Sequence, residues 1–166
     1  FLRAYEYWQL AMYYGGVPLV KQVLSIDDSN NQVRNTLAEV TEYAKTELVA
    51  AAKDAGVESN LDYAIFQNYG YQGLYGGLGA KEIHARKELK KSQKILDHMG
   101  STELAANLFR ATQTEEKLRR ENIQGKQAAN NTHYEVGKKV RQTIAELGGT
   151  MPEDLPTPEK SIKQIE

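Results

Sequence analysis

The starts of helices are marked more clearly in this sequence than any other feature. Thr36 is followed three residues later by Glu39, and Ser59 is followed at the same distance by Asp62. In such a pair the hydroxyl of the first residue accepts from the backbone N–H of the acidic residue, and the carboxylate accepts from the backbone N–H of the first residue. Each pair therefore predicts the start of a helix. Gly56 is a suitable terminator of the first helix. Apolar residues recur at helical spacing between these signals: Val40, Ala44, Leu48 and Ala51.

The second half of the chain continues the helical pattern. Residues 101–122 carry an apolar stripe formed by Leu104, Leu108, Ala111 and Leu118. Residues 131–147 carry another, formed by Val136, Val140, Ile144 and Leu147. No segment alternates apolar and polar residues as a half-buried strand would. The sequence therefore predicts an all-α fold of about five or six helices in an irregular bundle, with an extended, proline-containing tail at residues 151–166.

Residues 69–79 are rich in glycine and tyrosine. Each glycine costs a helix roughly 1 kcal/mol relative to alanine. We therefore expect residues 69–79 to form a tight connection between helices. Its tyrosines would pack against those helices, although they could instead stack on the bases of a single strand.

From residue 80 the pattern is helical again and becomes basic. At about 100° per residue, five cations fall on one face of this helix. They are Arg86, Lys87, Lys90, Lys91 and Lys94. Cations elsewhere would extend this face if their helices pack alongside: Arg119, Arg120, Lys138, Lys139 and Arg141. Such a surface could follow a phosphate backbone, with salt-dependent affinity. The alternative is that these residues only form the solvated side of an amphipathic helix.

Residues 1–14 form a predicted helix with little polar surface. Most of its faces carry apolar or aromatic residues: Phe1, Leu2, Tyr5, Tyr7, Trp8, Leu10, Met12, Tyr13 and Tyr14. Large exposed apolar patches mark interfaces or sites of aggregation. We therefore expect self-association through this helix, or poor solubility of the chain.

The sequence gives no sign of catalysis or of a bound cofactor. It has no cysteine, which excludes thiolate metal sites and fits a cytoplasmic protein. None of the three histidines, His84, His98 and His133, has metal-ligand spacing, and His133 is expected to be hydrogen-bonded and partly buried. No apolar run approaches the roughly 20 residues of a membrane-spanning helix. We expect a non-enzymatic protein without metal, cofactor, membrane span or small-molecule substrate.

Three stretches after residue 50 match a known family. They are AGVESNLDYAIFQNYGYQGLYGGLGAKEIHARK, LKKSQKILDHMGSTELAANLFRATQTEEKLRREN and THYEVGKKVRQTIAELGGTMPEDLPTPEKSIKQIE. Together they resemble the C-terminal region of the DNA-damage-inducible protein D (DinD) family. This resemblance implies a bacterial factor of the SOS response that acts on filaments of RecA and single-stranded DNA. The amino-terminal domain of that family, which resembles phage antirepressor modules, is expected to be missing.

The first part of the chain has a second resemblance. FLRAYEYWQLAMYYGGVPLV and RNTLAEVTEYAKTELVAAA are similar to the helical core of the SusD/RagB family of outer-membrane glycan-binding lipoproteins. These two resemblances predict three parts: residues 1–49, residues 50–150 and a tail at residues 151–166. On this interpretation the chain is a chimera. The alternatives to filament binding are a glycan-binding fragment or a chimera with no evolved function.

Overall fold

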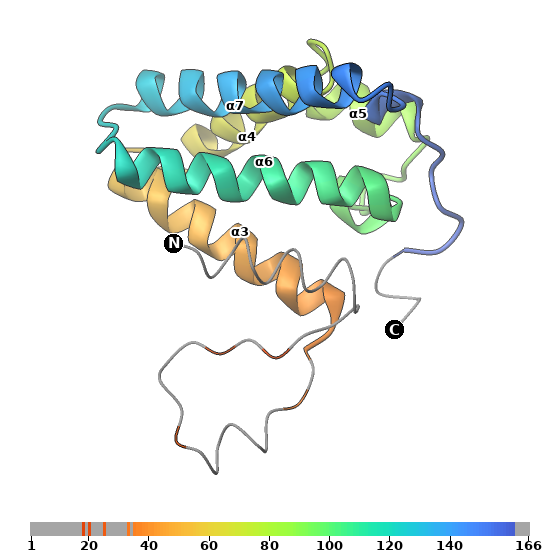
Figure 1. Cartoon of the computed structure of the whole chain (residues 1–166), viewed down its shortest axis with the longest axis horizontal. Coiled ribbons are helices and arrows are strands. Elements are labelled where there is room, and N and C mark those ends of the chain that lie inside the picture. Colours follow the sequence, from red (N-terminus) through yellow and green to blue (C-terminus); the bar gives the residue numbers. More distant parts are fainter. Residues whose placement is uncertain (1–17, 19, 21–24, 26–32, 34, 162–166) are drawn as a thin grey trace.

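The structure is a computed structural model of the chain and describes residues 18, 20, 25, 33 and 35–161 (Figure 1). Within these residues the fold is all-helical, as the sequence predicts. The elements are α3 (Leu37–Asp54), α4 (Asn60–Leu74), α5 (Ala80–Arg86), η1 (Ile95–His98), α6 (Ser101–Arg120), α7 (Lys126–Glu146) and η2 (Pro152–Asp154), where η denotes a short 3₁₀ helix. Helix α6 runs through the middle of the bundle, with α3 on one side and α7 on the other.

Both predicted capping boxes are confirmed. Thr36 Oγ1 accepts from the Glu39 backbone N–H at 3.2 Å, and the Thr36 N–H donates to the Glu39 carboxylate at 2.7 Å. Ser59 and Asp62 make the same two bonds at 3.0 and 3.1 Å. Helix α3 continues past residue 50 without a break. The division of the chain at residues 49/50 and 150/151 stays a prediction.

The predicted apolar stripes form most of the core. On α3 and α6 every predicted stripe residue is buried: Val40, Ala44, Leu48, Ala51, Leu104, Leu108, Ala111 and Leu118. On α7, Val140 is buried, whereas Val136 and Ile144 are half-buried. Leu147 is 81% exposed, so its assignment to the stripe is wrong. The reason is that residues 145–150 are all exposed, so the end of α7 extends beyond the part of the bundle that covers its apolar face.

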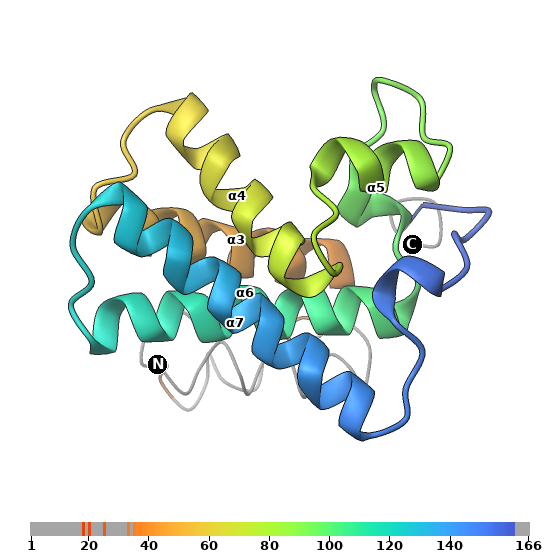
Figure 2. The ribbon, with the colours of Figure 1, turned by 90° about the horizontal axis from the view of Figure 1, so that it is seen from above.

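The predicted connector at residues 69–79 is too long, whereas the predicted packing of its tyrosines is confirmed by the burial of Tyr71 and Tyr75. Helix α4 continues to Leu74, and only residues 75–79 connect it to α5. The glycines fit in the helix because they let α4 and α7 approach closely (Figure 2). A Cβ atom on Gly137 of α7 would lie 2.8 Å from the carbonyl oxygen of Gly70 on α4. Dense packing of two backbones offsets the helix propensity that each glycine loses.

The predicted basic helix begins at Ala80 as expected, but it is too short to carry the five cations. Helix α5 ends at Arg86, and residues 87–94, which we call the cationic loop, contain no regular helix. Glu88 has φ +54°, a left-handed conformation that does not continue an α-helix. The His84 ring bonds to the carbonyl oxygen of Lys90 at 3.1 Å and holds the loop in a turn. The five predicted cations therefore do not share a helix face: Arg86, Lys87, Lys90, Lys91 and Lys94.

The described part of the tail folds back on the bundle. Pro152 is buried, and residues Pro152–Asp154 form η2 beside α5 and α7. Residues 1–14, with their predicted aromatic helix, lie outside the described residues. Self-association through that helix stays a prediction.

Candidate functional site

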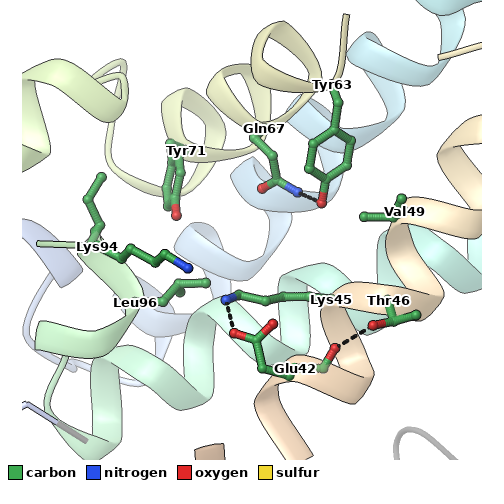
Figure 3. Close-up of a pocket in the computed structure, with 10 residues that line it drawn as sticks. Glu42, Lys45, Thr46, Val49, Tyr63, Gln67, Tyr71, Lys94 and Leu96 are labelled. Atoms are coloured by element: carbon green, nitrogen blue, oxygen red, sulfur yellow. Dashed lines mark hydrogen bonds and ion pairs between the residues drawn. The ribbon is translucent and has the colours of Figure 1, made fainter. Parts of the chain in front are cut away.

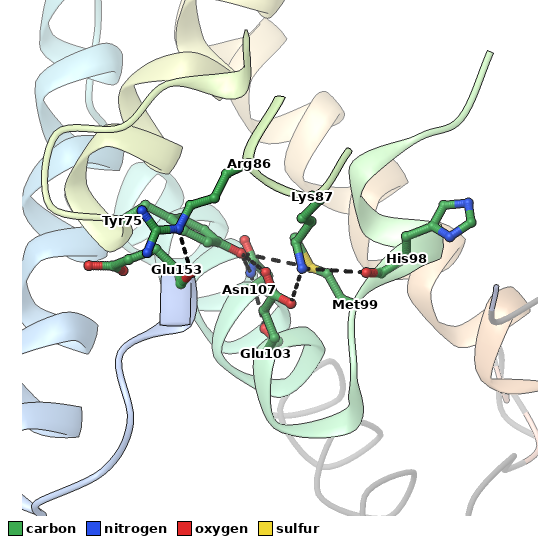
Figure 4. A network of polar contacts seen from close by, with 8 residues as sticks. All are labelled: Tyr75, Arg86, Lys87, His98, Met99, Glu103, Asn107 and Glu153. Carbon is green, nitrogen blue, oxygen red and sulfur yellow. Dashed lines mark hydrogen bonds and ion pairs between the residues drawn. The ribbon is translucent and has the colours of Figure 1, made fainter. Parts of the chain in front are cut away.

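Lys87 and Glu103 form an ion pair inside the protein (Figure 4). Lys87 Nζ donates to the Glu103 carboxylate at 2.7 Å, and the two side chains are 6% and 0% exposed. Lys87 Nζ also lies 3.5 Å from the carbonyl oxygen of His98. Removing one member of a buried pair leaves an uncompensated charge, which is strongly unfavourable. The pair therefore fixes the position at which the cationic loop leaves α5.

The ion pair continues into a series of buried hydrogen bonds. The Tyr75 hydroxyl donates to the Glu103 carboxylate at 2.7 Å and accepts from Asn107 Nδ2 at 2.8 Å. Asn107 Oδ1 accepts from Arg110 at 3.2 Å. Burial, followed by the nearby Glu103 charge, raises the pKa of Tyr75, so the phenol keeps its proton and can donate. These bonds join Tyr75, the residue that directly follows α4, to α6.

Arg110 and His133 complete this series where α4, α6 and α7 meet. Arg110 is 2% exposed and His133 is 0% exposed. Arg110 Nη1 donates to His133 Nε2, and His133 Nδ1 donates to the carbonyl oxygen of Phe66 at 3.0 Å. Burial, followed by the Arg110 charge, lowers the pKa of His133 well below its usual value, so the ring is neutral. The hydrogen-bonded role predicted for His133 is confirmed, and its burial is complete.

We call these six residues the buried polar chain: Lys87, Glu103, Tyr75, Asn107, Arg110 and His133. Sequence reasoning missed it, although α6 carries a signal for it. Four polar residues on α6 recur at intervals of four, three and four, and each is at most 2% exposed: Glu103, Asn107, Arg110 and Thr114. This spacing marks one face of a helix. Polar residues along a buried face must find partners, so they indicate an interior hydrogen-bond network.

Two of the predicted cations bind the tail. Arg141 makes two hydrogen bonds to the Glu153 carboxylate, at 2.7 and 2.8 Å. Arg86 donates to Asp154 at 2.8 Å and to the carbonyl oxygen of Glu153 at 2.8 Å. Burial raises the pKa of Glu153, but the hydrogen bonds that its carboxylate accepts and the charges of Arg141 and Arg86 together lower the pKa below its usual value. Both arginines are therefore neutralised within the chain.

Arg119 and Arg120 do not extend the cationic loop either. They lie at the C-terminal end of α6, which has 20 residues and is about 30 Å long. The cationic loop lies before the N-terminal end of the same helix. Arg119 lies 3.3 Å from Glu47 of α3, and Arg120 pairs with Glu116. The structure therefore separates these two arginines from the loop and pairs them with carboxylates.

The remaining predicted cations are exposed and have no acidic partner among the described residues: Lys90, Lys91, Lys94, Lys138 and Lys139. The first three lie in the cationic loop, and the last two lie on α7. The predicted set thus divides into one buried cation, four that are paired on the surface, and five that are available to a partner.

The described residues also limit the kinds of site that the domain can form. In the part of the chain that the structure describes, no three His, Asp or Glu residues are grouped so that they could hold a metal ion. No described helix is long and apolar enough to cross a membrane. The geometry defines an all-helical domain that encloses a buried polar chain and exposes a cationic loop.

Comparison with known proteins identifies the family. The model of the DinD C-terminal domain family matches residues 25–165, and the chain belongs to this family. The chain is similar to the DNA damage-inducible protein D of Escherichia coli (strain K12), with 61% identity over 159 residues. This alignment covers 92% of the chain but only 58% of the length of that relative. No solved structure matches the chain.

The comparisons do not support the resemblance of residues 1–49 to the SusD/RagB family. The family model already begins at residue 25. Because the alignment with the Escherichia coli protein covers 92% of the chain, it also includes most of residues 1–49. The interpretation of the chain as a chimera therefore has no support.

Proposed function

We propose that this chain is a non-enzymatic interaction module of the DNA-damage response, which binds RecA filaments on single-stranded DNA in the cytoplasm. Its family membership and the name of its relative, a DNA damage-inducible protein, support the biological setting. The resemblance to DinD supports the filament as the partner. The exposed cations of the chain supply the surface that such a partner requires.

The observation that carries the proposal is the charge of the cationic loop. Lys90, Lys91 and Lys94 fall within five consecutive residues, are exposed, and have no acidic partner among the described residues. Lysines that approach nucleic-acid phosphates displace condensed counterions, and this release favours binding. The buried pair of Lys87 and Glu103 fixes one end of the loop, so its lysines are presented from a defined position.

The proposal of a binding rather than a catalytic role rests on accessibility. His133 is fully buried and both of its ring nitrogens are hydrogen-bonded. Glu103 is likewise enclosed, with Lys87 and Tyr75 as its partners. General acid–base catalysis requires a group within hydrogen-bonding reach of the substrate. Neither of these groups offers a free atom to a substrate.

Binding of the full chain to RecA filaments tests the proposal. Filaments assembled on single-stranded DNA should bind the wild-type chain, and binding should weaken as salt concentration rises. The variant Lys90→Gln, Lys91→Gln, Lys94→Gln should bind at least about tenfold more weakly at low salt, because it loses three phosphate contacts. Fluorescence anisotropy with a labelled strand measures both effects.

The matched control replaces exposed lysines elsewhere. Lys53→Gln with Lys160→Gln changes the net charge in the same direction, and we expect it to have a much smaller effect on binding. The pair Lys138→Gln and Lys139→Gln determines whether α7 contributes. Equal binding by the wild-type chain and the loop variant, at every salt concentration, would contradict the proposal.

A further inference from the structure

A cavity of about 430 Å³ opens between α3 and α4, beside the cationic loop (Figure 3). Its walls include Tyr63, Gln67 and Tyr71 of α4 and Lys45 of α3. Lys94 lines it from the loop. Pockets for small organic ligands have volumes of roughly 300–1,000 Å³. This cavity therefore has room for one group of the size of a nucleotide.

Contacts with residues outside the cavity fix the Tyr71 ring in the cavity wall. Tyr71 is 7% exposed, with the Arg110 guanidinium 5.0 Å from its ring centroid and the Tyr75 ring at 6.0 Å. The Tyr63 hydroxyl accepts from Gln67 Nε2 at 2.6 Å, which leaves the Gln67 carbonyl and its second N–H for a ligand. Rigid aromatic rings beside an amide suit a flat ligand with polar edges. A nucleobase has this chemistry.

Lysine side chains give the same cavity an anion-binding side. Lys45 lies 2.7 Å from Glu42, which also lines the cavity, so its charge is largely balanced. Lys94 is exposed and has no acidic partner among the described residues. Figure 3 shows the Lys45 and Lys94 side chains directed into the space between α3 and α4. The net positive charge favours a phosphate beside the aromatic wall.

We infer that this cavity binds one unpaired nucleotide of a single strand, with the base against Tyr63 and Tyr71 and a phosphate at Lys94. The inference rests on the proposed function, because the cationic loop must first bring the strand to the cavity. Lys94 connects the two sites, since it belongs to the loop and lines the cavity. A strand that follows the loop from Lys90 and Lys91 to Lys94 would bring one base to the cavity, which Lys94 lines.

Comparison of two strands separates base capture from phosphate contact. We expect the full chain to bind a short oligothymidylate roughly tenfold more tightly than an abasic strand of equal length, because one stacked base contributes about that factor. Thr46→Trp fills the cavity from an exposed position on α3. This variant should lose the preference and keep its affinity for the abasic strand.

A matched pair of tyrosine variants tests the aromatic wall. Tyr63→Leu removes a ring that lines the cavity and should abolish the preference for the oligothymidylate. Tyr69→Leu changes the same residue type on the same helix, outside the lining of the cavity, and should retain the preference. Circular dichroism confirms that each variant is helical before its affinity is measured.

The outcomes distinguish this inference from the proposed function. Equal affinity of the wild-type chain for both strands, with dependence on the loop lysines retained, overturns the inference alone. Retention of the preference by Thr46→Trp also overturns it. Tighter binding of free thymidine monophosphate than of the oligothymidylate would assign the cavity to a free nucleotide, and the inference would be wrong. If neither a strand nor a filament binds, both the inference and the proposed function are wrong.

Discussion

The buried polar chain and the cationic loop use lysine in opposite ways. Lys87 is enclosed and bonded to Glu103, whereas Lys91, four residues later, is exposed and has no acidic partner among the described residues. In the sequence the two look equivalent. The first stabilises the fold and the second is available to a partner, so the number of cations in a segment does not measure the charge that it presents.

Removing the counter-charge of Lys87 should produce the largest effect. Glu103→Gln keeps the size of the side chain but leaves a buried ammonium group without a carboxylate. We expect the free energy of unfolding to fall by about 3 kcal/mol or more, because breaking a buried ion pair costs that much. Denaturation in urea, followed by circular dichroism, measures it.

Two controls accompany this prediction. Lys91→Gln, in the exposed region of the same loop, should change the free energy of unfolding by less than about 0.5 kcal/mol. Combining Glu103→Gln with Lys87→Met removes both charges, and it should recover part of the loss. If Glu103→Gln is as stable as Lys91→Gln, the contrast between the two regions is wrong.

The close packing of α4 against α7 helps to enclose the buried polar chain. Gly137→Ser would place a Cβ atom 2.8 Å from the carbonyl oxygen of Gly70. We expect a loss of about 1–3 kcal/mol, as is typical of overpacking. Gly100→Ser is the matched control, because a Cβ atom there meets no atom within 4 Å. A thermal denaturation in which Gly137→Ser matched Gly100→Ser would count against a tight helix contact.

The ion pair between Arg141 and Glu153 of the tail should contribute less to stability. Arg141 is 26% exposed and Glu153 is 14% exposed, so the pair is partly screened by solvent. Glu153→Gln removes charge-assisted hydrogen bonds, and we expect a loss of about 1–2 kcal/mol. Glu159→Gln, in an exposed part of the same tail, is the control and should be neutral. Equal urea midpoints for the two variants would exclude a stabilising ion pair.

Acidification should gradually lower the free energy of unfolding through His133 of the buried polar chain. The pKa of His133 is lowered in the folded state, so below about pH 6.5 the unfolded chain binds a proton that the folded chain does not. The free energy of unfolding should therefore fall by at most about 1.4 kcal/mol per pH unit below that pH. His133→Gln should lack this component. Parallel pH profiles for the wild-type chain and the variant would refute it.

The local parts of the fold could be predicted from the sequence, whereas the distant contacts could not. Capping boxes and apolar stripes depend on residues three or four positions apart, and they identified the start of α3 and the buried faces of α3 and α6. The continuation of α4 to Leu74 depends on Gly137, which is more than sixty residues away. The expected cost of each glycine was therefore offset by a contact that no local pattern reveals.

The candidate site was predictable to the same extent. The ten predicted cations were identified as charges, but the partners of three of them come from other elements. Arg86 and Arg141 bind tail residues, and Lys87 binds a residue of α6. The apparent helical periodicity of this segment concealed the end of α5 at Arg86, although Lys90 and Lys91 are exposed, as the sequence indicates.

The salt dependence of binding tests the central claim most directly, namely that three loop lysines remain available to an anionic partner. Each lysine that contacts a phosphate of a single strand contributes about 0.7 to the slope of log affinity against log salt concentration. Replacing Lys90, Lys91 and Lys94 by glutamine should therefore reduce the magnitude of that slope by about 2. An unchanged slope in this triple variant would contradict the account.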